Sequence, residues 1–143
     1  MAAKVFDSFE TLLLDLDGVI YEGKNAVAEA VESTIAVRST GIKVGYITNN
    51  SSRKPETIAD QLRGFGIELS NDDVISSAQA GVELLATMIP KGSKVLVVGG
   101  DGLRFEVQAA GFELVELSDD KPAAVIQGFA PEVGWKNLAE EFE

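Results

Sequence analysis

A short apolar run that ends in two carboxylates and a glycine is the feature that most limits the possible folds of this chain. Leu12–Leu14 is followed by Asp15, Leu16, Asp17 and Gly18. An apolar run of this length predicts a buried strand, and the acidic turn behind it predicts where the strand ends. Residues i and i+2 of a strand point the same way, about 6.6 Å apart at about 3.3 Å per residue. We therefore expect Asp15 and Asp17 to lie side by side at the mouth of a sheet.

Two carboxylates this close together indicate a divalent metal site. They repel each other, and each raises the other's pKa, unless a cation neutralises them. Donor sets made only of oxygen favour Mg²⁺ over zinc. The alternative interpretation is a solvated acidic turn at the end of a strand, where Asp and Gly are common.

The composition narrows the chemistry. The 143 residues are 45% hydrophobic, enough for the core of one domain or of two small ones. The chain has no cysteine and no histidine, which excludes disulfides, thiolate nucleophiles, Ser-His-Asp catalysis and Cys or His metal ligands. A formal net charge of −11 argues against a nucleic-acid partner and against an anionic membrane surface. No apolar run reaches the length of a membrane span, so the simplest expectation is a cytoplasmic protein.

Strand-like and helix-like segments alternate along the chain, which predicts an α/β fold with parallel strands. We expect further strands at Lys43–Thr48, Lys94–Val98, Phe112–Leu117 and Ala123–Gln127. We expect helices from Val27 to a stop at Gly41, from Pro55, over Val82–Ile89 and over Asp101–Ala110. A last helix is expected from Pro131, carrying Phe142 and Trp135, with Trp135 as a packing residue or, as the alternative, an oligomer contact. We predict the domain boundary near residues 75–80, although the composition changes only weakly there.

A second group of polar residues follows the strand predicted at Lys43–Thr48. Thr48, Asn49 and Asn50 lead into two serines, just before the helix that starts at Pro55. Helix N-termini bind phosphate readily, and the carboxyl ends of parallel strands meet at one edge of a sheet, where ligands bind. An ordinary N-capping turn is the alternative for this segment taken alone. Together with the acidic pair, it predicts an anion site opposite a metal site.

These residues carry a family resemblance. Asp15–Tyr21 and Ile47–Ser52 resemble the first two signature motifs of the haloacid dehalogenase superfamily. More narrowly, they are similar to the NagD-like phosphatases, which include phosphoglycolate and p-nitrophenyl phosphate phosphatases. Val97–Arg104, with Ala109–Phe112 after it, resembles the α/β cap domain of that subfamily. The resemblance implies part of a Rossmann-like core domain over residues 1–76 and part of an α/β cap domain over residues 77–143.

The resemblance also implies a reaction, the hydrolysis of a small phosphorylated metabolite. Asp15 would be the nucleophile that forms an aspartyl-phosphate, and Asp17 the general acid and then the general base. Mg²⁺ would bind the Asp15 carboxylate and the Asp17 main-chain carbonyl. Related caps often mediate dimers, so a homo-oligomer formed through the cap is a further expectation.

The remaining implied roles concern substrate binding. Thr48 would donate a hydrogen bond to the phosphoryl oxygens, helped by the amides of Asn49 and Asn50. Gly18 would allow the tight turn behind the acidic pair.

The chain also departs from the family pattern. Family members carry a lysine that neutralises the phosphoryl group and a further acidic motif that completes the metal site. Both would fall beyond Glu143, so we expect the chain by itself to bind metal weakly and to turn over poorly. A non-catalytic relic or binding module of the same ancestry is therefore the alternative function.

Two other function classes fit less well. A signalling receiver domain also uses an acidic pair, but its acceptor Asp lies on a different strand, and no Asp ends Lys43–Thr48. The segment Gly99–Gly102 suggests a dinucleotide-binding turn, but the third glycine of that fingerprint is missing. We expect a turn of the cap domain there instead.

Overall fold

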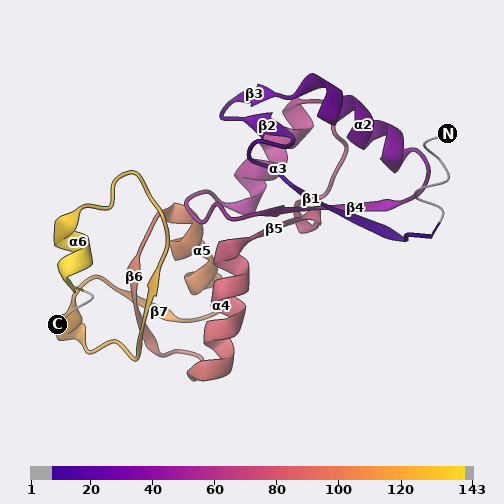
Figure 1. Ribbon diagram of the computed structural model, residues 1–143. Coiled ribbons are helices and arrows are strands. Elements are labelled where there is room, and N and C mark those ends of the chain that lie inside the picture. The colour runs from indigo at the N-terminus through magenta and orange to yellow at the C-terminus, as the bar shows by residue number, and fades with distance from the viewer. Residues whose placement is uncertain (1–7, 141–143) are drawn as a thin grey trace. The chain divides into compact units, whose positions relative to one another are not determined.

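Strands and helices alternate along residues 8–140, the part of the chain that the computed structural model describes (Figure 1). The α/β class predicted from the sequence is confirmed, because the paired strands with defined register in both sheets run parallel and carry helices between them. The chain divides into two compact units. The first comprises the residues up to Thr48 together with Glu56–Ile75, and the second comprises Asn49–Pro55 together with the residues from Ser76 onward. Assignment of a core and a cap role to such units stays a prediction.

The first unit is built on a three-stranded sheet with the strand order β1-β4-β5. Its strands are β1 (Thr11–Asp15), β4 (Lys43–Thr48) and β5 (Val74–Ser76), with a small antiparallel hairpin of β2 (Tyr21–Glu22) and β3 (Asn25–Ala26). Its helices are α2 (Ala28–Arg38) and α3 (Pro55–Gly64), with one 3₁₀ turn at Asn71–Asp73. Proline suits the first position of α3, because no intrahelical partner is lost there.

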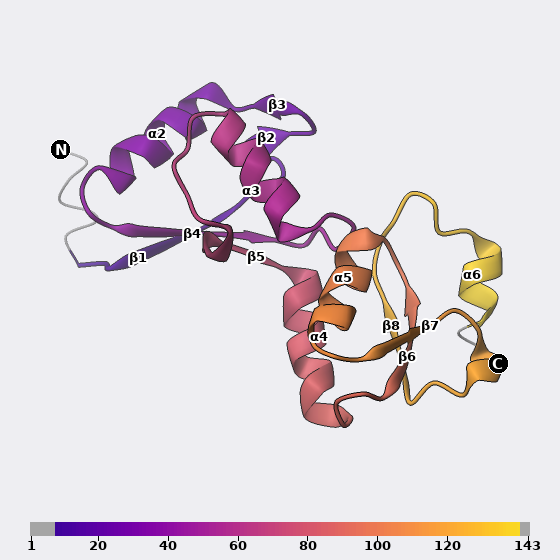
Figure 2. The same cartoon turned by 180° about the vertical axis from the view of Figure 1, so that it is seen from behind.

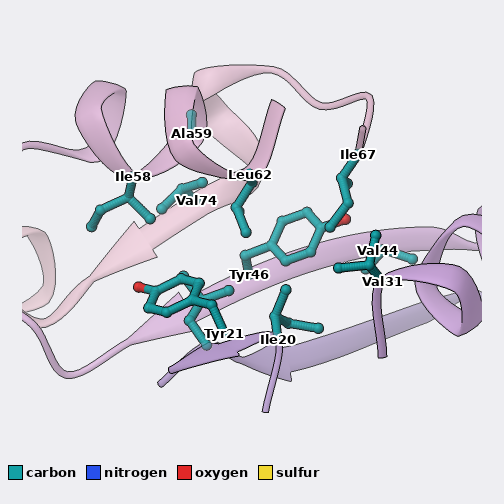
Figure 3. Packing of buried hydrophobic residues seen from close by; sticks show 11 residues of the cluster. Ile20, Tyr21, Val31, Val44, Tyr46, Ile58, Ala59, Leu62, Ile67 and Val74 are labelled. Carbon is teal, nitrogen blue, oxygen red and sulfur yellow. The ribbon is translucent and has the colours of Figure 1, made fainter. Parts of the chain in front are cut away.

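Both helices of the first unit lie on the same face of its sheet (Figures 1 and 2). On that face Tyr46 of β4 and Leu62 of α3 are completely buried. Figure 3 shows Ile20, Tyr46 and Leu62 pointing into the space between the sheet and α3. On the opposite face Leu13 is 59% exposed and Ile47 is 40% exposed. Burial therefore follows the period of two that a sheet covered on one face requires.

The second unit has a parallel sheet with β6 in the centre, in the order β7-β6-β8. Its elements are α4 (Ser77–Met88), β6 (Lys94–Val98), α5 (Asp101–Ala109), β7 (Glu113–Val115), a 3₁₀ turn at Ser118–Asp120, β8 (Ala124–Gln127) and α6 (Trp135–Ala139). Val97 of β6 packs in the cluster formed with α4 and α5, whereas Val98 packs in the cluster that includes Leu138 of α6. The central strand is therefore buried on both faces, as its continuous apolar sequence predicts.

The start of α4 shows how the sequence sets a helix boundary. The Ser76 hydroxyl accepts a hydrogen bond from the Gln79 backbone N–H at 3.3 Å, and the Gln79 side chain accepts one from the Ser76 N–H at 2.9 Å. This reciprocal capping box satisfies two donors that have no partner inside the helix.

Several expectations are corrected by the structure. The last helix begins at Trp135 rather than Pro131, and Trp135 is 79% exposed, so its role as a packing residue was wrong. The strand expected at Phe112–Leu117 covers only Glu113–Val115. The hairpin and β5 were not predicted, since two or three residues give too short a pattern to recognise. Phe142, expected on the last helix, lies outside the described residues.

None of the helices in residues 8–140 is both long and apolar enough to cross a membrane.

Candidate active site

Strand β1 delivers the first carboxylate to the end of the sheet. Asp15 is its last residue, and Leu16 directly behind it is completely buried. Burial of Leu16 fixes the direction of the chain, so that Asp15 and Asp17 on either side of it are both exposed. The Asp15 carboxylate accepts a hydrogen bond from the Leu16 backbone N–H at 2.8 Å. The structure thus leaves both acidic side chains open to solvent and to a ligand.

A tight turn follows Asp17 and is held by hydrogen bonds to the buried residue Leu16. The Leu16 carbonyl accepts hydrogen bonds from the backbone N–H groups of Val19 (3.1 Å) and Ile20 (2.9 Å). The Gly18 N–H donates to the Tyr21 carbonyl at 2.8 Å, and Gly18 has φ +78°. Glycine adopts this left-handed conformation without the steric cost of a side chain. The tight turn that the sequence predicts at Gly18 is therefore present.

Strand β4 ends beside β1. Asp15 pairs with Ile47 in the parallel register, so Thr48 ends β4 one step beyond that pair. Thr48 is only 6% exposed, on the face of β4 that Tyr46 occupies, whereas Asp15 shares the exposed face of Ile47. The two strand ends come together as the sequence predicts. A direct approach of the Thr48 hydroxyl to a phosphoryl group bound at Asp15 stays a prediction.

Asn49 and Asn50 belong to the second unit, where they start a tightly bonded loop. The Asn50 side-chain oxygen accepts hydrogen bonds from the Ser52 N–H (3.0 Å), the Ser52 hydroxyl (2.9 Å) and the Arg53 N–H (3.3 Å). The Asn49 side chain is exposed, and its backbone carbonyl accepts a hydrogen bond from the Ser77 hydroxyl at 2.8 Å. The Asn50 side-chain oxygen thus stabilises the conformation of the loop, a role that was not predicted from the sequence. Asparagine two residues before a serine is a known turn former and could have indicated it.

The donor set at the acidic turn is made of oxygen alone. Two carboxylates and the main-chain carbonyls of the turn are hard ligands of the kind that Mg²⁺ and Ca²⁺ take. Within residues 8–140, no group of three or more acidic, His or Cys side chains gathers in a way that could hold a metal ion. Asp15 and Asp17 could therefore supply only part of a coordination shell of this kind.

The haloacid dehalogenase-like hydrolase family matches residues 12–113, which include the acidic turn, β4 and the loop behind it. The chain belongs to this family. The narrower resemblance to the NagD-like phosphatases is also confirmed, because the similar proteins are phosphatases of that kind.

Two curated relatives illustrate the similarity. It is 39% identical over 131 residues to the D-glycerol 3-phosphate phosphatase of Mycobacterium tuberculosis, covering 92% of this chain and 36% of the relative. It is 36% identical over 110 residues to phosphoglycolate phosphatase 2 of Arabidopsis thaliana, covering 76% of this chain and 36% of the relative. The chain thus spans about a third of the length of these curated relatives.

Two solved structures also resemble this chain. The glycerol phosphate phosphatase of M. tuberculosis in complex with magnesium matches with a TM-score of 0.83 and 38% identity, over 92% of this chain and 39% of that one. The p-nitrophenyl phosphatase of Archaeoglobus fulgidus matches with a TM-score of 0.80 and 27% identity, over 92% of this chain and 49% of that one.

Proposed function

We propose that this chain carries the nucleophile and the phosphate-binding segment of a Mg²⁺-dependent phosphatase that hydrolyses small phosphomonoesters through an aspartyl-phosphate. The observation that carries the proposal is the pairing of β1 with β4, since Asp15 ends one strand and Thr48 ends the neighbouring one. In parallel sheets, ligands bind at this carboxyl edge. Membership of a hydrolase family whose similar members are named phosphatases supports the same activity.

The proposed reaction has two steps. An oxygen of the Asp15 carboxylate attacks phosphorus, the bond from phosphorus to the alcohol oxygen breaks, and the Asp17 carboxyl donates its proton to the leaving oxygen. In the second step the Asp17 carboxylate takes a proton from water as the water oxygen attacks phosphorus. Inorganic phosphate leaves and the Asp15 carboxylate is restored. The exposed position of both side chains permits in-line access from solvent.

The metal would be held by the Asp15 carboxylate and the Asp17 main-chain carbonyl, and the oxygen-only chemistry of this turn fits Mg²⁺. When bound, Mg²⁺ would neutralise charge on the phosphoryl group during transfer. The Thr48 hydroxyl and the Asn49 and Asn50 amides would bind the phosphoryl oxygens. The relatives named above act on D-glycerol 3-phosphate and phosphoglycolate, which supports a small phosphorylated metabolite as substrate.

The proposal is tested by phosphate release from p-nitrophenyl phosphate with Mg²⁺ present. Asp15→Asn removes the nucleophile and is expected to reduce the rate to background. Asp72→Asn is the matched control, because Asp72 is an exposed carboxylate in the first unit, away from the turn. Equal rates for the unaltered chain and Asp15→Asn would remove the catalytic claim.

A binding module without catalysis is the second candidate. It is favoured by the absence, within residues 8–140, of a third side chain that would complete a metal-binding cluster. In that case the chain binds Mg²⁺ and inorganic phosphate in a titration, Asp15→Asn weakens binding of the metal, and no phosphate is released.

A further inference from the structure

The loop that follows β4 is fastened to α5 by main-chain contacts within the second unit. The Gly102 N–H in the first turn of α5 donates a hydrogen bond to the Ser52 carbonyl at 3.0 Å. The Lys54 ammonium lies 4.7 Å from the centroid of the Phe105 ring on the same helix. Ser51, at the middle of the loop, is buried. The loop therefore lies against a fixed surface.

Three glycines, Gly100, Gly102 and Gly128, form that surface, and we call them the glycine seat. A Cβ atom on Gly102 would lie 2.5 Å from the Arg53 carbonyl oxygen and 2.7 Å from the Ser51 carbonyl oxygen. Cβ atoms in proteins essentially never come within 3.0 Å of such atoms, and these neighbours are backbone that cannot rotate away. Position 102 therefore requires glycine, because the loop backbone leaves no space for a side chain there.

Gly100 and Gly128 also lie against this loop. A Cβ on Gly128 would lie 2.5 Å from Ser51 Oγ and 3.1 Å from Ser51 Cβ, and a Cβ on Gly100 would lie 3.0 Å from Ser52 Cα. The backbone of Gly100 has φ −79°, which any residue adopts, so only the tight approach of Ser52 favours glycine there. The loop at Ser51–Arg53 therefore packs against the turn at Gly99–Gly102, the segment that suggested a dinucleotide fingerprint.

We propose that Gly102 and Gly128 are positioning residues for catalysis, because the glycine seat holds the segment from Asn49 to Arg53 in its phosphate-binding conformation. This inference rests on the proposed function, in which that segment supplies amides to the phosphoryl group. A methyl group on Gly102 would displace the loop by about 0.7–0.9 Å, because contacts of 2.5 and 2.7 Å fall that far short of the 3.4 Å at which ordinary van der Waals contact begins. A misplacement of about 1 Å in a catalytic site costs up to about a hundredfold in rate.

The test compares Gly102→Ala with Gly81→Ala. Both glycines lie in helices of the second unit, Gly102 in the first turn of α5 and Gly81 inside α4, so each variant replaces a helical glycine by alanine. A Cβ on Gly81 would meet only Ile126 Cδ1 at 3.6 Å, an ordinary contact. The measurements are amide hydrogen exchange at Ser52 and Arg53, and titration of inorganic phosphate in the presence of Mg²⁺, followed by the ¹⁵N shifts of residues 50–53.

We expect Gly102→Ala to accelerate exchange at both amides and to weaken phosphate binding at least tenfold, while Gly81→Ala behaves as the unaltered chain. A Gly102→Ala variant that binds phosphate as the Gly81→Ala control does overturns the proposal, whatever its exchange rates. Weakened binding with unchanged exchange also overturns it, since the effect would not pass through the loop. If the unaltered chain binds no phosphate, the positioning role fails with it. If it binds phosphate but releases none from p-nitrophenyl phosphate above the Asp15→Asn background, only the catalytic proposal fails.

A second pair of variants serves if Gly102→Ala does not fold. Gly128→Ala is expected to weaken phosphate binding. Adding Ser51→Gly removes both Ser51 atoms that the new methyl group would meet and leaves only Leu103 Cδ2, the end of a flexible side chain, at 3.1 Å. The double variant should bind phosphate as tightly as Ser51→Gly alone. Absence of this rescue, with equal urea midpoints for the variants, would overturn the positioning role.

Discussion

Asp15 lies directly opposite Ile47 in the parallel ladder between β1 and β4, and both side chains are on the exposed face of the sheet. Thr48 is the next residue and is buried on the other face. The carboxylate is therefore reached from solvent, whereas the Thr48 side chain is almost completely buried.

Asp17→Asn should affect substrates according to their leaving groups. A general acid contributes about 10²–10⁴-fold when the leaving oxygen is strongly basic, as in an alkyl phosphate, and less when it is p-nitrophenolate. We expect a much larger loss of rate for glycerol 3-phosphate than for p-nitrophenyl phosphate, measured by phosphate release. Asp15→Asn, the control, should suppress both substrates alike. Equal losses for Asp17→Asn would contradict its role as the acid.

Thr48→Val should weaken phosphate binding. The side chain is only 6% exposed, so valine fills the same space without the hydroxyl. Loss of one hydrogen bond to a charged group costs about 1.5–3 kcal/mol, or roughly tenfold to a hundredfold in affinity. Isothermal titration with inorganic phosphate measures the change, and Thr11→Val on the exposed part of β1 is the control. Unchanged affinity would remove Thr48 from the site.

Tyr46→Phe should reduce the loss of stability that occurs at alkaline pH. Burial raises the pKa of the Tyr46 hydroxyl above its usual value of 10.0, and the nearby Arg38 guanidinium lowers it by less. The folded state therefore holds this proton more tightly than the unfolded state, so the free energy of unfolding falls as the pH rises above about 10. Urea denaturation from pH 8 to 11 should show a steeper decline for the unaltered chain than for Tyr46→Phe. Parallel declines would contradict the pKa shift.

Leu62→Ala and Leu13→Ala should differ strongly in stability although the substitution is the same. Leu62 is completely buried under α3, whereas Leu13 is 59% exposed on the uncovered face. A buried leucine replaced by alanine costs about 2–5 kcal/mol, while exposed positions stay within about 0.5 kcal/mol. Both tyrosines lie in the first unit, so their near-UV circular dichroism in urea reports on it. Similar midpoints for the two variants would mean that the bare face is covered in solution.

The sequence determined those features that depend on neighbours close along the chain. The bounds of β4 and β6, the turn at Gly18 and the exposure of Asp15 all follow from local periodicity, since side chains alternate in a strand and glycine permits a left-handed turn. Only the tertiary structure decided that both helices of the first unit cover one face and that Trp135 is exposed. Only it assigned the loop after Thr48 to the second unit. That assignment depends on contacts with Gly102 and Gly128, which lie far along the chain, and a local pattern holds no information about which distant backbone will fill the space a glycine leaves.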